Sequence, residues 1–258
     1  MSWDITDTDK YYRTPEGQLV AEILVTDLTG LRGARVTGPD ADTSDRLAVG
    51  YPFPLLPPDD CPPVFMLSET GVLSWMGGSG GITACIDSLS WPCATDMFDQ
   101  ILISHALEHV SDKSAFLAEV FRCLKGEGEV ILVVPHRRSL WARADTTPFG
   151  QGTPFSRRQL KLALEQAGFD HISIKHSLYM PPFGRHLPLA MRRRLHHVGR
   201  LGWAVFGGVL LATAKKRLYS AHPHPSHALR RKVRQFMVRQ PAGAMTPLRR
   251  NKTGLSRE

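Results

Sequence analysis

Cysteine is scarce in this sequence and long apolar runs are missing from it. Only four cysteines occur among 258 residues, and their spacing matches no set of metal ligands, so we expect no disulfide scaffold and no metal site. No run reaches eighteen apolar residues, which argues against a membrane-spanning helix. Asp4, Asp7 and Asp9 stand where a signal peptide would carry basic and apolar residues. These absences predict a reduced, cytoplasmic protein.

The charge of the chain is unevenly distributed. The formal net charge is +8, and 42% of the residues are hydrophobic, which is typical of a globular protein. Residues 1–134 carry a net charge of -12, residues 135–213 of +9 and residues 214–258 of +11. We therefore predict three parts: an N-terminal helix and connector over 1–44, a main domain over 45–218, and a basic, flexible tail over 219–258.

Strand and helix patterns alternate along the main domain. Short apolar runs predict strands over 46–51, 64–67, 82–86, 100–104, 130–134, 171–179 and 208–212. Helical spacing predicts helices from Thr14, over 111–125 with Gly126 as the C-cap, over 155–167, and over 188–205. Alternation of this kind indicates an α/β fold with a doubly wound, mostly parallel sheet of seven strands. Ligands of such folds bind at the carboxyl ends of the strands.

Three consecutive segments carry a family resemblance. The segment Phe98 to Asp112 reads FDQILISHALEHVSD, residues 121–128 read FRCLKGEG, and the strand after them closes in Val134-Pro135. Together with the helix that ends in Ala167-Gly168-Phe169, they resemble the class I S-adenosylmethionine-dependent methyltransferases. They look most similar to the branch of ubiquinone and menaquinone biosynthesis. The resemblance covers roughly residues 45–215 and implies a Rossmann-like methyltransferase fold.

The resemblance implies where S-adenosylmethionine would bind. Gly50 matches the glycine-rich turn that approaches the methionine end of the cofactor, although only one glycine stands where two or three are usual. Glu69 is the candidate for holding the ribose hydroxyls. Asp87, with Ser88 beside it, matches the acidic residue that meets the adenine amino group. Ser104 and His105 match the loop that lies against the cofactor.

The segment from His136 to Gly150 is the candidate acceptor region. It holds three arginines, a tryptophan and an aspartate, a mixture that suits an anionic or aromatic small molecule and equally suits a charged, solvated loop. Methyl transfer depends mainly on positioning, and a base is needed only if the acceptor must lose a proton. His105, His136 and Asp145 are the catalytic candidates for that base.

Two classes of function remain open. The first is a methyltransferase acting on an unidentified acceptor. The second is a degenerate methyltransferase-fold protein that serves as a binding or regulatory module, which the single glycine at Gly50 favours. A nicotinamide-dependent dehydrogenase fits poorly because no G-x-G-x-x-G follows an early strand.

The basic C-terminal half suggests partners of opposite charge. Its basic runs at 192–197 and 229–236 suit a nucleic acid backbone, an anionic membrane surface or a phosphorylated small molecule. A solvated basic face followed by a flexible tail is the simpler interpretation.

Overall fold

The computed structural model describes part of the chain. The described residues are 4–31, 45–57, 62–70, 82–182, 188–202 and 207–217. The chain divides into two units, 1–222 and 223–258, and every described residue belongs to the first. The basic tail predicted over 219–258, with its run at 229–236, therefore lies outside the described residues.

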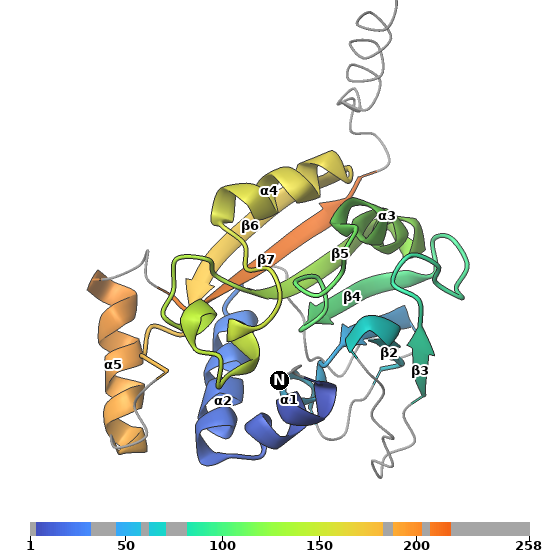
Figure 1. The fold of residues 1–258 in the computed structure, drawn as a ribbon. Coiled ribbons are helices and arrows are strands. Elements are labelled where there is room, and N and C mark those ends of the chain that lie inside the picture. Colours follow the sequence, from blue (N-terminus) through green and yellow to red (C-terminus); the bar gives the residue numbers. More distant parts are fainter. Residues whose placement is uncertain are drawn as a thin grey trace, which may run out of the picture. The chain divides into compact units, whose positions relative to one another are not determined.

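A seven-stranded sheet forms the centre of the first unit (Figure 1). Its strands follow the order β3-β2-β1-β4-β5-β7-β6. The pairs from β3 through β5 are parallel, whereas β7 is antiparallel to both β5 and β6. The strand bounds are β1 Arg46–Gly50, β2 Val64–Leu67, β3 Thr83–Ile86, β4 Phe98–Ser104, β5 Leu124–Pro135, β6 Phe169–Ser177 and β7 Val209–Lys216. The predicted doubly wound, mostly parallel sheet is confirmed.

Helices cover both faces of the sheet. Figure 1 shows α3 and α4 on one face and α1 and α2 on the other, with α5 beyond α2. Their bounds are α1 Ile5–Tyr12, α2 Pro15–Thr29, α3 Lys113–Cys123, α4 Arg157–Gln166 and α5 Leu189–Gly202. Among the described helices, none is both long enough and apolar enough to span a bilayer.

Alternation along the strands divides the core into two layers. In β1, Leu47 and Val49 face the layer beneath α3 and α4, and Ala48 faces the layer beneath α1 and α2. Because both faces are covered, all five residues of β1 are buried.

The first two helices begin at side-chain caps. Asp4 caps α1 in a capping box with Asp7. Thr14 Oγ1 accepts the N–H of Gly17 at the start of α2, and Pro15 takes the first helical position, as predicted. These caps fix α1 and α2, and Tyr12 of α1 reaches Tyr51 and His105 beyond the ends of β1 and β4.

The predicted helix over 111–125 is shorter than expected. Asp112 caps α3, but the helix ends at Cys123, and the prediction of Gly126 as its C-cap is wrong. Leu124 is already extended, fully buried and paired with Phe98 of β4. Burial against β4 therefore ends the helix before the glycine is reached.

Candidate functional site

The carboxyl ends of β1 to β4 lie along one edge of the sheet, because these strands are parallel and in register. Gly50, the last residue of β1, has a φ of +88° and pairs with Ser104, the last residue of β4. A Cβ on Gly50 would lie 2.2 Å from the Ser104 carbonyl oxygen and 2.8 Å from Ala106 Cβ. Only glycine allows the loop after β4 to approach β1 this closely.

Glu69 and Ser88 meet beyond the ends of β2 and β3. Glu69 is exposed in a short 3-10 turn after β2, and its Oε1 accepts a short hydrogen bond from the hydroxyl of buried Ser88. Asp87 is also exposed, and its Oδ1 accepts the N–H of Leu89 at 2.7 Å, so it stabilises the turn after β3. The fold thus brings Glu69 next to the Asp87–Ser88 pair.

His105 is buried in the loop after β4 with two polar neighbours. The Tyr12 hydroxyl of α1 lies 2.9 Å from His105 Nε2, and Glu108 Oε1 lies 3.4 Å from His105 Nδ1. Since a carboxylate only accepts, the arrangement favours a proton on Nδ1 and a Tyr12 hydroxyl that donates to Nε2. Tyr12, His105 and Glu108 therefore form one buried series of polar groups.

Burial and the neighbouring groups together set the protonation of the two ends of this series. Desolvation, together with the nearby Tyr11, Tyr51 and Glu108, raises the pKa of Tyr12 well above its usual value, so the phenol stays protonated. Burial alone would raise the pKa of Glu108 as well, but His105 and His109 outweigh it and hold that pKa below its usual value. Glu108 is thus a buried carboxylate beside an imidazole.

A hollow of about 530 Å³ opens where the turn after β1 meets α1 and α2. Tyr12 and Tyr51 stack with their ring centroids 5.8 Å apart, and Phe53 packs edge-on against Tyr51 at 5.3 Å. Tyr51 also donates its hydroxyl to Asp9 at 2.7 Å, which raises the pKa of Tyr51 in addition to the larger effect of burial. The hollow is therefore walled by three aromatic rings and bordered by Asp9, Glu22 and Arg13, of which Asp9 and Arg13 form an ion pair at 2.7 Å.

His136 and Asp145 lie apart from this series. His136 is buried, its Nδ1 lies 3.0 Å from the carbonyl oxygen of Gly207, and its ring packs against His176. Asp145 is exposed, and its carbonyl oxygen accepts a hydrogen bond from Gln151. Among the described contacts, none joins either residue to His105, so the three candidate bases do not form one cluster.

Sequence reasoning missed Tyr12, Tyr51, Asp9 and Glu108 as members of the site. Tyr12 stands 93 residues from His105, and only the packing of α1 against the sheet brings them together. Glu108 could have been noticed, because a carboxylate inside the apolar run Ala106-Leu107-Glu108 is unusual for a buried segment.

Comparison with known proteins agrees with this architecture. Residues 70–174 match the family model described as a methyltransferase domain. Over these residues the chain is similar to methyltransferase domains. The match does not single out the ubiquinone and menaquinone branch, and no curated protein matches the sequence.

Two solved methyltransferases share the fold. An S-adenosylmethionine-dependent methyltransferase from Thermotoga maritima superposes with a TM-score of 0.57 at 13% identity, over 83% of this chain and 96% of that one. A second, from Archaeoglobus fulgidus, gives a TM-score of 0.56 at 17% identity, over 82% of this chain and 99% of that one. At these identities the likeness concerns the fold.

The turn after β1 departs from the glycine-rich pattern that is usual in the class I methyltransferases. Among the described residues between β1 and β2, the only helical element is the 3-10 turn Phe53–Leu55. Tyr51, Pro52 and Phe53 stand where further glycines are usual. Gly50 keeps the close contact with the loop after β4, whereas Tyr51 and Phe53 occupy the positions of the other glycines.

Proposed function

We propose that this methyltransferase domain transfers a methyl group from S-adenosylmethionine to an anionic small molecule. The observation that carries the proposal is the aromatic hollow beside Gly50, joined through Tyr12 to the buried His105–Glu108 pair. The family match and the shared fold support the same reaction.

The residues at the strand ends suit this cofactor. Glu69 and Ser88 offer oxygen atoms that can hold ribose hydroxyls, and the exposed carboxylate of Asp87 can accept from an adenine amino group as well as from Leu89. Tyr12, Tyr51 and Phe53 supply aromatic rings to the hollow, and aromatic rings attract cations such as the sulfonium at the methionine end of the cofactor. The oxygen atoms at the strand ends and the aromatic rings of the hollow therefore suit S-adenosylmethionine.

The sulfonium supplies an activated methyl group, so the protein's main task is to orient the acceptor for in-line attack. His105 is the base that we assign, and it acts through Tyr12, whose hydroxyl passes its proton to Nε2 while taking one from the acceptor. The Glu108 carboxylate stabilises the imidazolium that results. His136 and Asp145 lack a contact with this series, which leaves them as acceptor-side residues in the proposal.

A binding module without transfer is the second candidate. The 3-10 turn in place of a helix after β1 favours it, since that turn departs most from an active family member. The two functions differ in whether S-adenosylhomocysteine is produced, not in whether the cofactor binds.

Calorimetric titration of the full chain with S-adenosylmethionine and S-adenosylhomocysteine tests cofactor binding. We expect Glu69→Ala and Asp87→Ala to weaken both ligands about 10-fold or more, the loss typical of a charged hydrogen bond. Glu165→Ala is the control, because Glu165 is an exposed residue of α4, and this variant should bind both ligands as the parent protein does. Absence of binding at millimolar ligand would reject the proposal.

Transfer is tested by the release of S-adenosylhomocysteine with a panel of anionic metabolites as acceptors. His105→Asn should retain the cofactor and lose about 100-fold or more in rate, as expected for removal of a general base. Cofactor binding without product from any acceptor would favour the binding module.

A further inference from the structure

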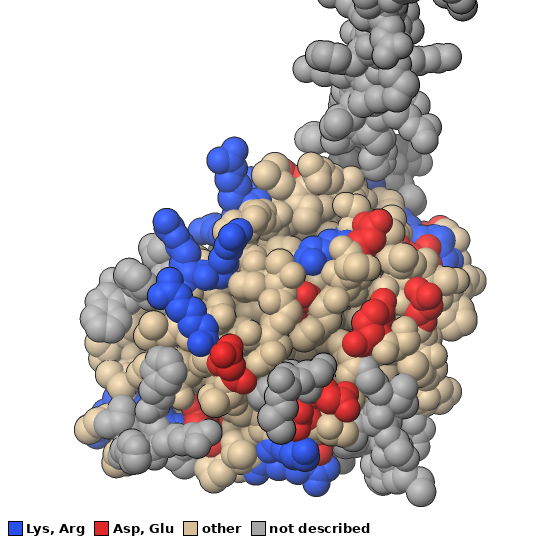
Figure 2. All heavy atoms as spheres, in the orientation of Figure 1, with Lys and Arg blue, Asp and Glu red and all other residues tan. Residues whose placement is uncertain are grey.

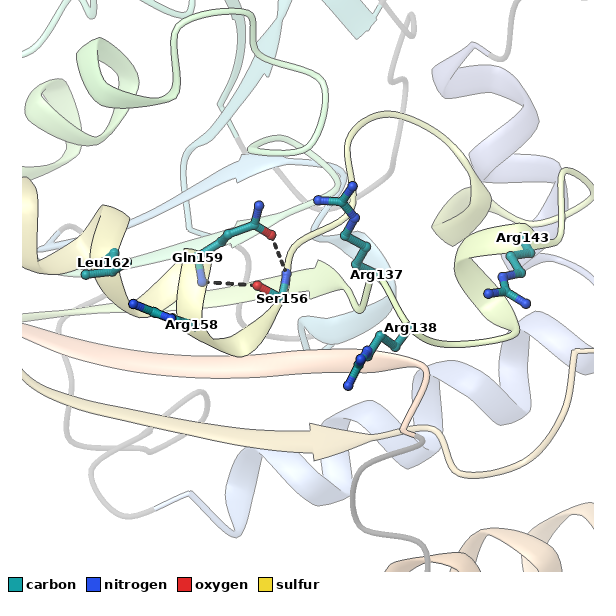
Figure 3. Close-up of a pocket in the computed structure, with 7 residues that line it drawn as sticks. All are labelled: Arg137, Arg138, Arg143, Ser156, Arg158, Gln159 and Leu162. Atoms are coloured by element: carbon teal, nitrogen blue, oxygen red, sulfur yellow. Dashed lines mark hydrogen bonds between the residues drawn. The ribbon is translucent and has the colours of Figure 1, made fainter.

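A second hollow is lined in part by the candidate acceptor region, residues 136–150. It has a volume of about 480 Å³ and is lined by Arg137, Arg138 and Arg143 from the segment after β5 and by Arg158 from the first turn of α4 (Figure 3). Figure 2 shows basic side chains gathered on this side of the molecule, where that segment meets α4. The domain thus places four guanidinium groups around one opening.

These four arginines lack carboxylate partners within the described part of the chain. No ion pair there joins any of them to an aspartate or glutamate, whereas Arg122 pairs with Glu119 and Arg193 pairs with Glu22. Unpaired arginines that line one hollow give it a positive potential, which attracts anions. The arrangement is therefore better suited to a bound anion than to an empty surface.

The other polar groups of the hollow also donate hydrogen bonds. In the capping box of α4, Ser156 Oγ accepts the Gln159 N–H and Gln159 Oε1 accepts the Ser156 N–H. The box uses the acceptor atoms of both side chains and leaves the Ser156 hydroxyl proton and the Gln159 amide protons to donate. Every charged or polar side chain of the lining can thus donate to an anion.

Phosphate is the anion that this chemistry fits. Guanidinium groups bind phosphate oxygens in pairs of parallel hydrogen bonds, and a phosphate monoester carries close to two negative charges with three strong acceptors. S-Adenosylmethionine has no phosphate, so a phosphate bound here would belong to a molecule other than the methyl donor. The hollow, at about 480 Å³, also has room for more of a ligand than its phosphate group.

A continuous loop links this hollow to His105. The Phe149 ring lies 5.0 Å from the His105 ring, the Thr153 N–H donates to the Glu108 carbonyl at 2.8 Å, and the Arg137 N–H donates to the Phe155 carbonyl at 2.8 Å. The segment that carries the arginines is therefore anchored directly to the loop that carries the assigned base.

We infer that the four-arginine hollow binds the phosphate group of the methyl acceptor, so that the acceptor is a phosphorylated small molecule. This inference rests on the proposed function, but the phosphate site can be tested without transfer.

The experiment is calorimetric titration of the full chain with inorganic pyrophosphate at constant ionic strength. We expect saturable binding, weakened about 10-fold by either Arg138→Gln or Arg158→Gln. Arg157→Gln is the matched control, because Arg157 is the neighbouring exposed residue of α4 and does not line the hollow. Circular dichroism confirms that each variant is folded.

Several results would overturn the inference. Equal weakening by Arg157→Gln and Arg158→Gln would mean a diffuse basic field instead of a site. Saturable binding of a short single-stranded RNA that depends on Arg138, with no binding of pyrophosphate, would assign the hollow to nucleic acid.

The two proposals fail separately. If the parent protein binds S-adenosylmethionine but does not bind pyrophosphate, the phosphate site alone is rejected. Pyrophosphate binding without any cofactor binding would reject the transferase and leave an anion-binding protein.

Discussion

At the scale of single residues, two left-handed backbone positions shape the edge of the sheet. Gly50 and His105 have φ values of +88° and +50°, and they face each other across the ends of β1 and β4. The turn at His105 directs its ring toward Tyr12, and the missing side chain of Gly50 lets that turn approach. The proposed base, His105, is therefore positioned by a glycine that has no side chain to take part in the chemistry.

Gly50→Ala should be strongly destabilising. Its Cβ would collide with the Ser104 carbonyl, and alanine disfavours the positive φ, so we expect a loss of about 3 kcal/mol in the free energy of unfolding. Gly30→Ala is the control, since its Cβ would meet nothing nearer than 3.5 Å at a helical φ. Urea denaturation measures both. Equal stability of the two variants would contradict the role of the close approach.

At the scale of elements, the end of α3 meets the loop that precedes β4. Arg122 donates to the carbonyl oxygens of Trp91 and Cys93, which fixes this loop against the helix. Cys93 Sγ and Cys123 Sγ are consequently 2.8 Å apart as free thiols. Burial, and next the hydrogen bond with Cys93, raises the pKa of Cys123, so its thiolate is disfavoured.

A disulfide oxidant such as dipyridyl disulfide should join Cys93 to Cys123. Each thiol loses a proton and an electron, and the reagent is reduced to two thiopyridines. We expect a stabilisation of about 2–4 kcal/mol from closing this loop, measured by thermal unfolding, with the bond located by peptide mass mapping. Cys123→Ser should abolish both the bond and the gain. A bond from Cys93 to Cys85 instead would refute the pairing.

At the scale of the whole molecule, folding keeps histidines neutral beside the sheet. Burial lowers the pKa of His176 to about 4, and the charges of His136 and Arg157 add to the effect. Burial also lowers the pKa of His136, against which His176 packs. An unfolded histidine titrates near about 6.5, so the folded protein binds fewer protons below that pH.

Stability should therefore fall as the pH drops through the window from about 6.5 to about 4. Because His176 is only half-buried, we expect it to contribute about 1 kcal/mol between about pH 7.5 and about pH 5. His176→Gln should reduce this dependence, and His171→Asn, an exposed site on the same strand, should not. Urea denaturation at both pH values measures the free energy of unfolding of each variant. An unchanged slope in His176→Gln would contradict the assignment.

The sequence by itself determined the class of fold and most elements. Apolar runs and caps are local signals, so the strands, Thr14, Asp112 and the α4 start were predictable from neighbouring residues. The early end of α3 was not, because it depends on the pairing of Leu124 with Phe98 across the sheet.

Only the tertiary structure decided the candidate site. Tyr12 meets His105 across 93 residues, and the arginines of the loop after β5 line one hollow with Arg158, where the Arg137–Phe155 backbone hydrogen bond joins that loop to the start of α4. Such contacts depend on how helices pack on the sheet, which local sequence patterns do not encode. The sequence could thus predict individual candidate residues, but which of them lie together in one site depends on the packed fold.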